Sequence, residues 1–393
     1  MLANYYFAFR SRRALKGNVI DICIAHDTHA LNAAVAIARP RGARLVYDAV
    51  EIPLIRERSG QYQANHLNGL AIKLINECIE PRTIRRADLV ISNSPGHARW
   101  HREHYRLHRE PALVCNARPY QPPSRTMQIR QDAGLAPHER LVLYIGNAQR
   151  DYGLEELVRA LPMMAPRVHV GFLGFMPDSY AAEITGLVQQ MQVGPRFHVL
   201  APVANDAVPC YASGADVGVV TLHRKVLNME LSLPNRFFDC VMARLPIAAS
   251  ELPAVVQYID HYGIGMTFDE QRPEHMARVI EAMLEDERQA EFRARAERAA
   301  VDLCWERGEQ TLVSAIEGLA SGSRGLRICI VARKNIWRTR RVVRMAESLQ
   351  RTGHQVTVVC PFPGDAAAAQ SGVRYLTADD GRGLARRLLA RNG

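Results

Sequence analysis

Residues 228–250 read NMELSLPNRFFDCVMARLPIAAS and carry the clearest fold signal in the chain. Ser232 can cap a helix, and Pro234 suits a first helical turn, where a backbone N–H lacks a partner anyway. Apolar side chains then recur at helical spacing, at Phe237, Phe238, Val241, Met242 and Leu245. The stretch therefore predicts a loop, a helix with one buried face and, over residues 245–249, a short apolar strand.

The start of this helix is suited to an anion. Its first turn leaves backbone N–H groups free and carries a partial positive charge, which favours phosphate. Asp239 lies one turn further on, where its carboxylate can accept hydrogen bonds from ribose hydroxyls. The alternative interpretation is an amphipathic helix that follows a turn and binds nothing.

The same residues resemble the donor-binding signature of family 4 glycosyltransferases, S-L-P-N-[KR]-x-F-E followed by a helix, a glycine and Leu-Pro-Val. The matching positions are Ser232, Leu233, Pro234, Asn235, Arg236, Phe238 and Pro246. Asp239 stands where the family has the glutamate that binds the donor ribose. Two positions depart from the pattern, because Leu231 replaces a partner glutamate and Arg244 replaces the glycine.

Size and composition favour a two-domain globular protein. The chain has 393 residues, of which 48% are hydrophobic and 23% charged, and no apolar run is long enough to span a bilayer. The first residues lack the features of a secretion signal, and the eight cysteines show no zinc-binding spacing. We therefore expect reduced thiols in a cytoplasmic protein.

The net charge of +10 is concentrated at the two ends of the chain. Residues 1–16 carry +4 and residues 326–393 carry +9, whereas the remainder is slightly acidic. A basic face of this kind could meet anionic lipid, a phosphate-bearing acceptor or nucleic acid. Residues 2–16 also mix aromatic and basic side chains, as expected either for a segment in a membrane interface or for a helix packed on the protein's own core.

Polar side chains follow the first predicted strands. Residues 19–25 form an apolar run that ends at His26, and residues 44–47 form another that is followed by Asp48 and Glu51. Strands that alternate with helices predict a parallel sheet, whose ligands lie beyond the carboxyl ends of the strands. The family resemblance, H-D after one strand and D-x-H-E after the next, implies that His26 and Glu51 contact the acceptor or the reacting sugar. Val50 replaces the second histidine of that pattern.

A row of histidines follows the next predicted strand, residues 87–94. His97, His101, His104 and His108 have a spacing that could hold a metal ion. Arginines alternate with them, so a solvated surface helix that binds no metal is favoured. The prolines of residues 119–125 then predict an interdomain linker.

A second α/β unit begins near Glu139. Residues 141–145 predict a strand that turns at Gly146, where the missing Cβ lets backbone approach a donor diphosphate. The family has a basic residue immediately before a second glycine, but Tyr152 stands there. Arg150, two positions earlier, is the candidate substitute, and Lys225 and its neighbour Arg224 are a second source of positive charge.

The end of the chain restarts the pattern. Residues 326–331, 355–359 and 373–376 predict strands, residues 342–349 a helix, and residues 384–389 a further helix. The run A-x-S-L-x-x-x-G-H-x-V-T-V-V resembles the opening of the family's N-terminal domain, which the start of this chain lacks. The chain is therefore either circularly permuted or a tandem arrangement cut within its second copy. Because an isolated half sheet would expose strand edges, we expect residues 326–331 to pair in parallel with residues 19–25.

Together these observations predict an α/β fold with two Rossmann-like domains facing a cleft, the GT-B arrangement. Residues 1–125 and 326–393 form the acceptor-side domain, and residues 126–320 bind the nucleotide-sugar donor. The predicted donor-binding residues are Gly146, Arg150, Lys225, Ser232, Asn235, Arg236 and Asp239, and the predicted catalytic residues are His26 and Glu51.

The resemblance implies transfer of a hexosyl group to a glycan or lipid-linked acceptor, with retention and without a metal ion or other cofactor. The charge pattern predicts that the protein attaches peripherally to the cytoplasmic face of a membrane. The alternatives are a nucleotide-sugar epimerase and a non-catalytic glycosyltransferase-like binding subunit. Nucleic-acid binding has charge in its favour but no recognition motif.

Overall fold

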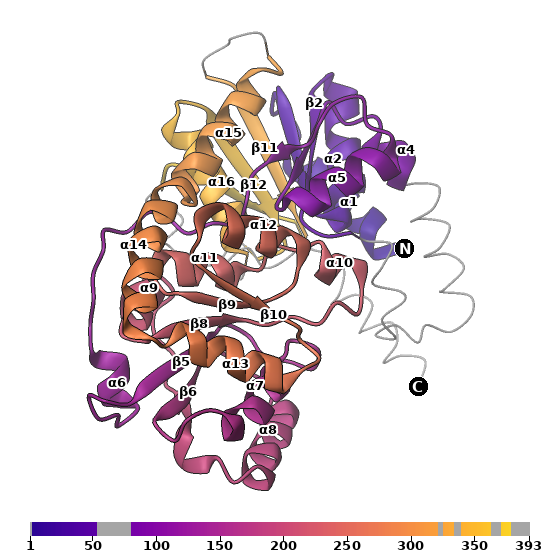
Figure 1. The fold of residues 1–393 in the computed structure, drawn as a ribbon. Coiled ribbons are helices and arrows are strands. Elements are labelled where there is room, and N and C mark those ends of the chain that lie inside the picture. The colour runs from indigo at the N-terminus through magenta and orange to yellow at the C-terminus, as the bar shows by residue number, and fades with distance from the viewer. Residues whose placement is uncertain (1, 53–79, 321–324, 334–338, 363–370, 379–393) are drawn as a thin grey trace, which may run out of the picture. The chain divides into compact units, whose positions relative to one another are not determined.

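A computed structural model of the chain describes residues 2–52, 80–320, 325–333, 339–362 and 371–378 (Figure 1). The chain divides into two compact units, the first formed by Met1–Cys115 with Gly308–Gly393 and the second by Asn116–Arg307. Each unit contains one parallel sheet flanked by helices, as predicted for an α/β fold. The predicted helix at residues 384–389 lies outside the described residues.

The first unit has a seven-stranded sheet of order β13-β12-β11-β1-β2-β3-β4. Its strands are β1 (Ile22–His26), β2 (Arg44–Ala49), β3 (Leu89–Ser92), β4 (Ala112–Leu113), β11 (Arg327–Ala332), β12 (Gln355–Cys360) and β13 (Arg374–Thr377). In Figure 1 the strands from the end of the chain lie beside the indigo β1.

The predicted pairing is confirmed between a strand near the start of the chain, in the segment called the head (residues 1–125), and a strand near its end, in the segment called the tail (residues 326–393). β1 and β11 pair in parallel from Ile22 with Ile328 to His26 with Ala332, and β12 pairs with the other side of β11. Both central strands are buried along their apolar length, as a strand covered on two faces should be. β11, β12 and β13 therefore complete the sheet that β1 to β4 only begin.

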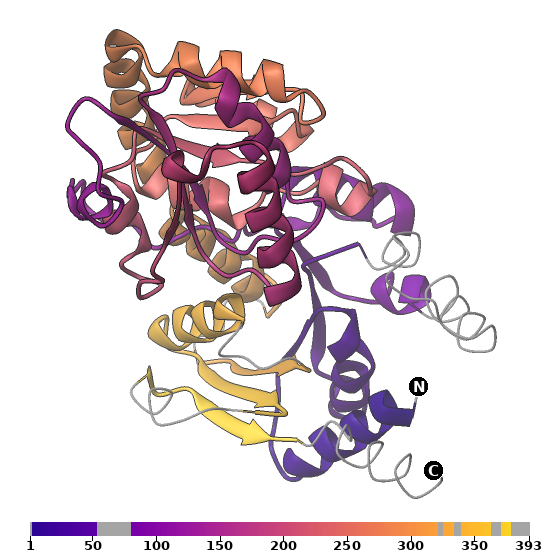
Figure 2. The ribbon, with the colours of Figure 1, turned by 90° about the horizontal axis from the view of Figure 1, so that it is seen from below.

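Helices cover both faces of this sheet. They are α1 (Leu2–Ala14), α2 (Thr28–Ala38), α4 (Glu80–Ile84), α5 (Pro95–Tyr105), α16 (Arg340–Arg351) and most of α15 (Trp305–Glu317). Figure 2 shows α1 alongside α2, and Phe7 and Leu15 are fully buried in the core that these helices share. The helix formed by residues 2–14 thus packs one face on the protein's own core. Its other face exposes Tyr5 and Phe9.

Only half of the histidine row is on the solvated surface that the arginine pattern suggested, since His104 and His108 are exposed. His97 and His101 are buried, and the Nδ1 atom of His101 lies 2.9 Å from Oγ of Ser92. Burial lowers the pKa of His101 to about 3, so this imidazole stays neutral. α5 ends at Tyr105, before His108, so the row is not one continuous helical stripe.

The second unit has a six-stranded sheet of order β10-β9-β8-β5-β6-β7. Its strands are β5 (Arg140–Ile145), β6 (Val168–Leu173), β7 (Phe197–Leu200), β8 (Val217–Val220), β9 (Ile247–Ser250) and β10 (Gly265–Phe268). Its helices are α6 (Gln128–Asp132), α7 (Leu154–Ala160), α8 (Asp178–Gln190), α9 (Val208–Ala212), α10 (Leu227–Glu230), α11 (Asn235–Met242), α12 (Pro253–Tyr262), α13 (Pro273–Met283) and α14 (Asp286–Asp302).

The central stretch folds into a turn, a helix and a strand, but its predicted cap is wrong. Pro234 occupies the N-cap position of α11, and the helix begins at Asn235. The hydroxyl of Ser232 instead donates to the carbonyl oxygen of Met229, 2.8 Å away, because residues 227–230 form the short helix α10. α11 buries both phenylalanines, and β9 follows as predicted. None of the described helices combines the length and apolar character that crossing a membrane requires.

The tail can be tested as a separate polypeptide. A chain ending at Ala320 should expose the edge of β1 and aggregate, whereas residues 325–393 supplied in trans should restore a monodisperse complex. Co-expression followed by size-exclusion chromatography measures this. A tail fragment carrying Ile330→Asp is the matched control, because Ile330 is fully buried opposite Ile24 and a carboxylate cannot be accommodated there. A well-folded chain ending at Ala320 would contradict the prediction.

Candidate functional site

The second sheet changes direction between β5 and β8. From β5 the chain adds β6 and β7 on one side, and then returns to add β8, β9 and β10 on the other. In open parallel sheets, ligands bind at the carboxyl ends of the strands at such a point. The loops that follow β5 and β8 therefore form the candidate site.

Two glycines allow the loop after β5 to take its course. Gly146 has φ of 101° and Gly153 has φ of 77°, both in the left-handed region that favours glycine. At Gly153 a Cβ would also lie 2.6 Å from Cβ of Thr221. The loops after β5 and β8 are therefore in direct contact, and a larger residue at Gly153 would separate them.

Hydrogen bonds join the same two loops. The Thr221 hydroxyl donates to the Tyr152 carbonyl oxygen, 2.6 Å away, and the His223 amide donates to the Asp151 carbonyl oxygen at 3.0 Å. Nε2 of His223 also lies 3.0 Å from the carboxylate of Glu156, which raises the pKa of His223. These contacts hold the two loops together.

Arg236 brings a buried positive charge to this point. Its guanidinium lies 4.3 Å from the centroid of the Tyr144 ring and donates to the carbonyl oxygens of Asn147, at 3.0 Å, and Thr221, at 3.4 Å. Those carbonyls belong to the loops after β5 and β8. A cation that bridges both loops at the switch point of a parallel sheet is suited to an anionic ligand.

Asp239 lies one turn further along α11 and is 5% exposed. It forms an ion pair with Arg118, whose guanidinium also donates to the carbonyl oxygen of Asn205 at 2.7 Å. This arginine was not predicted from the sequence, because it precedes Asp239 by about a hundred and twenty positions and lies just before the segment interpreted as a linker. The carboxylate is thus held in a fixed position by a partner from outside α11.

Comparison with known proteins identifies this part of the chain. Residues 126–301 match the family model of glycosyl transferases group 1. The match covers less than half of the chain, and over this stretch the protein is similar to group 1 glycosyltransferases. The match contains the switch point, both glycine turns, Arg236 and Asp239, and it confirms the predicted resemblance to family 4-like glycosyltransferases. No curated protein matches the sequence.

Solved structures show the same fold at low sequence identity. Sucrose-phosphate synthase from Thermosynechococcus elongatus is 17% identical, with a TM-score of 0.67 over 81% of this chain and 78% of that one. HepE from Anabaena, in complex with UDP-glucose, is 18% identical, with a TM-score of 0.61 over 77% and 79%. A trehalose-phosphate synthase from Burkholderia vietnamiensis is 15% identical, with a TM-score of 0.57 over 80% and 77%. The predicted GT-B fold is confirmed.

The other predicted donor residues of this stretch lie near its two loops but differ in their surroundings. Arg150 is exposed and forms a two-pronged ion pair with Glu183, at 2.6 and 3.0 Å. Lys225, also exposed, pairs with Asp151. Both cations already have carboxylate partners, so neither offers a ligand the uncompensated charge that was expected of it.

Ser232 and Asn235 lie before and at the start of α11. Asn235 is exposed, and its side-chain oxygen accepts a hydrogen bond from the amide of Asn116 at 2.8 Å. Ser232 is occupied with the Met229 carbonyl oxygen. Their donor-binding role stays a prediction.

In the first unit, the predicted catalytic residues follow adjacent strands. His26 ends β1 and is buried, and Glu51 is half-buried two positions beyond the end of β2. Nδ1 of His26 lies 2.7 Å from the carboxylate of Asp48, which is fully buried. Within the described residues, no group of His, Cys, Asp or Glu side chains has the arrangement of a metal site.

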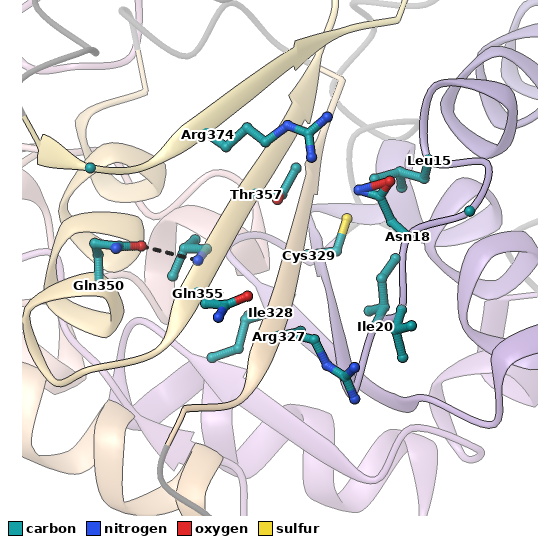
Figure 3. A pocket seen from close by; sticks show the side chains of 14 residues that line it. Leu15, Asn18, Ile20, Arg327, Ile328, Cys329, Gln350, Gln355, Thr357 and Arg374 are labelled. Carbon is teal, nitrogen blue, oxygen red and sulfur yellow. Dashed lines mark hydrogen bonds between the residues drawn. The ribbon is translucent and has the colours of Figure 1, made fainter.

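The opposite edge of the same sheet contains a hollow of about 490 Å³ (Figure 3). The residues that line it come from the segment after α1 and from the amino-terminal parts of β11, β12 and β13. Arg327, one of the two arginines that line the hollow, forms an ion pair with Asp21 at 2.6 Å. Because ligands of parallel sheets bind at the carboxyl edge, this hollow is separate from the candidate site.

Arg244 replaces the glycine expected after α11. Its side-chain contacts explain how an arginine is tolerated at this position. Its φ is 57°, in the left-handed region, and its guanidinium donates to the carbonyl oxygens of Met242 and, at 2.7 Å, Gln121. The ring of Tyr120 lies 5.5 Å from that guanidinium. Side-chain contacts with residues 120–121 thus offset the strain of a left-handed arginine.

Two substitutions separate these effects. Arg244→Ala and Arg244→Gly both remove the side-chain contacts, but only glycine relieves the left-handed strain. We expect the glycine variant to be more stable than the alanine variant by about 1 kcal/mol. Urea denaturation of both proteins under one set of conditions measures the difference. Equal midpoints would show that the backbone at this position is not strained.

Proposed function

We propose that the chain transfers a sugar from a nucleotide-sugar donor to a glycan or lipid-linked acceptor, with retention of configuration and without a metal ion or other cofactor. The observation that carries this proposal is the position of Arg236, which bridges the loops after β5 and β8 within the stretch similar to group 1 glycosyltransferases. The UDP-glucose complex of HepE supports a nucleotide sugar as donor. Retention is supported by the resemblance to family 4 enzymes, and a hexosyl group is the sugar we propose.

The donor would use the groups already assembled at the switch point. Gly146 and Gly153 let backbone approach a diphosphate, and the guanidinium of Arg236 lies beside them. Asp239, fixed by Arg118, would accept the ribose hydroxyls. In the first unit, His26 and Glu51 would contact the acceptor or the reacting sugar.

A non-catalytic binding subunit is the second candidate. Leu231 and Val50 stand where the family pattern has side chains that touch the substrate, and Tyr152 stands where it has a base. Such a protein would bind donor without turning it over. A nucleotide-sugar epimerase would instead convert the donor sugar and leave no transferred product, so product analysis separates all three.

Calorimetry with a panel of nucleoside diphosphates and nucleotide sugars tests donor binding. Arg236→Ala should weaken binding by about 1.5–3 kcal/mol, because a hydrogen-bonded cation beside the diphosphate is lost. Arg288→Ala is the matched control, since Arg288 is a half-exposed arginine of α14 that pairs with Glu285, away from both loops. Binding of no panel member would contradict the proposal, and binding without turnover would favour the binding subunit.

We also propose that the protein attaches to the cytoplasmic face of a membrane and builds a cell-surface polysaccharide or glycolipid there. The outward face of α1 supports this. Tyr5 and Phe9 are 61% and 60% exposed, and exposed basic residues surround them, namely Arg10, Arg12, Arg13 and Lys16. Aromatic rings can enter the headgroup layer while each basic residue near an anionic surface contributes about 1 kcal/mol.

Co-sedimentation with vesicles tests this attachment. Bound protein should increase with the fraction of anionic lipid and decrease with salt. The double variant Tyr5→Ser with Phe9→Ser should bind less, whereas Phe175→Ser, at a similarly exposed ring of the second unit, should bind normally. Recovery of the protein in the supernatant under all conditions would contradict membrane attachment and favour an acceptor that is not in a membrane.

A further inference from the structure

The tail of the chain contributes a buried ion pair to the carboxyl edge of the first sheet. Arg341, in the first turn of α16, donates to both carboxylate oxygens of Asp48, at distances of 2.7–3.1 Å. It also donates to the carbonyl oxygen of Val114 at 2.7 Å. Arg341 and Asp48 are 3% and 0% exposed, so the pair is closed to solvent.

Asp48 connects this arginine to His26. The two residues are direct neighbours in the pairing of β1 with β2, and Nδ1 of His26 lies 2.7 Å from Oδ2 of Asp48. The three side chains therefore form one row, Arg341–Asp48–His26. One of them comes from the tail and two come from the head of the chain.

The charge of Asp48 is fixed by its surroundings. Burial alone would raise its pKa, but the nearby charge of Arg341 and the hydrogen bond with His26 together hold the pKa well below its usual range. Asp48 is therefore an ionised carboxylate, which only accepts hydrogen bonds. It follows that Nδ1 of His26 carries the proton that is donated to it.

This leaves Nε2 as the second nitrogen of the His26 ring. Within the part of the chain that the structure describes, Nε2 makes no hydrogen bond. The adjacent carboxylate, Asp27, is directed to α2, where Oδ1 accepts from the backbone amide of Thr28 at 2.6 Å. Because Arg341 and Asp48 neutralise each other, His26 is not required as a counterion of the carboxylate.

We propose that Arg341 is a positioning residue: through Asp48 it holds His26 in the Nδ1–H form, so that Nε2 accepts a hydrogen bond from a sugar hydroxyl. This rests on the proposed function for the identity of the ligand. A purely structural ion pair would need no histidine beside it, and a well-packed apolar pair is often as stable as a buried ion pair. Without Arg341, His26 would be the one remaining charged partner of the buried carboxylate among the described residues. Nε2 would then become a donor.

Nitrogen NMR of labelled His26 tests the proposal directly. In the unchanged protein at neutral pH, Nδ1 should carry a proton and Nε2 should carry none. In Arg341→Met both nitrogens should be protonated, whereas Arg341→Lys, which keeps the charge, should resemble the unchanged protein. The double variant Arg341→Met with Asp48→Asn should return to a single proton on the ring, because the buried negative charge is gone, but that proton is no longer fixed on Nδ1, since an amide can either accept from or donate to that atom.

Across the variants, kcat for the nucleotide sugar should follow the protonation state of His26 seen by NMR and not the melting temperature. We expect Arg341→Met to lower kcat by about 10-fold to 100-fold, the range seen when an outer partner of a functional histidine is removed. Arg341→Lys should recover most of that loss even where thermal melting shows it less stable, whereas the double variant should not, because asparagine does not fix the proton on Nδ1. A merely structural role would instead make kcat follow the melting temperature across the series.

Donor binding separates this inference from the proposed function. The proposed nucleotide-binding residues lie in the second unit, so calorimetry with a nucleoside diphosphate, which carries no transferable sugar for His26 to contact, should give the same affinity for Arg341→Met as for the unchanged protein. No donor binding by the unchanged protein would remove the proposed function. A proton on Nε2 in the unchanged protein, or an unaltered His26 in Arg341→Met, would overturn the role of Arg341 while leaving donor binding intact.

Discussion

The parallel pairing of β1 with β11 is the constraint on which the first unit depends. β1 is the first strand of the chain, yet it lies in the middle of a seven-stranded sheet, so one of its two edges must be filled from more than three hundred positions away. The pairing is reinforced at both ends. Arg327 binds Asp21 at the amino edge, and Arg341 binds Asp48 at the carboxyl edge. Head and tail therefore form one folding unit, although the whole second unit separates them in the sequence.

The docking of the tail also sets the charge balance at the carboxyl edge of the first sheet. A sheet that ended at β1 would leave Asp48 buried beside His26 with no strong cation. Because burial of an unpaired carboxylate is costly, either the carboxylate or the imidazole would have to change its protonation. The tail removes that conflict by bringing a guanidinium with α16. A permuted or truncated arrangement of the sequence is thus compatible with an intact site, provided that the tail docks.

Much of the fold could be predicted from the sequence because the strands are apolar runs bounded by polar turns. The tail pairing could be predicted as well, since the motif at residues 346–359 completes a pattern that the head lacks. Details that depend on distant partners could not. The Ser232 cap failed because residues 227–230 form a helical turn that captures the hydroxyl. His97 and His101 were assigned to the surface because alternating arginines hid a buried face. The pairing of Arg118 with Asp239 has no local signal.

The distribution of ion pairs changes how the donor site must work. Arg150 and Lys225 were expected to meet a diphosphate, but each is exposed and paired with a carboxylate, and Arg224 pairs with the buried Glu270. Exposed pairs of this kind contribute little energy, and releasing them to bind a phosphate exchanges one carboxylate-like partner for another. Arg236 differs because its partners are neutral carbonyls and an aromatic ring. Among the described residues, no carboxylate forms an ion pair with it, so a diphosphate at the switch point would gain the full attraction of a buried cation. The electrostatic part of donor binding should therefore depend on this one guanidinium and on the backbone around Gly146, and not on the number of basic residues in the loops.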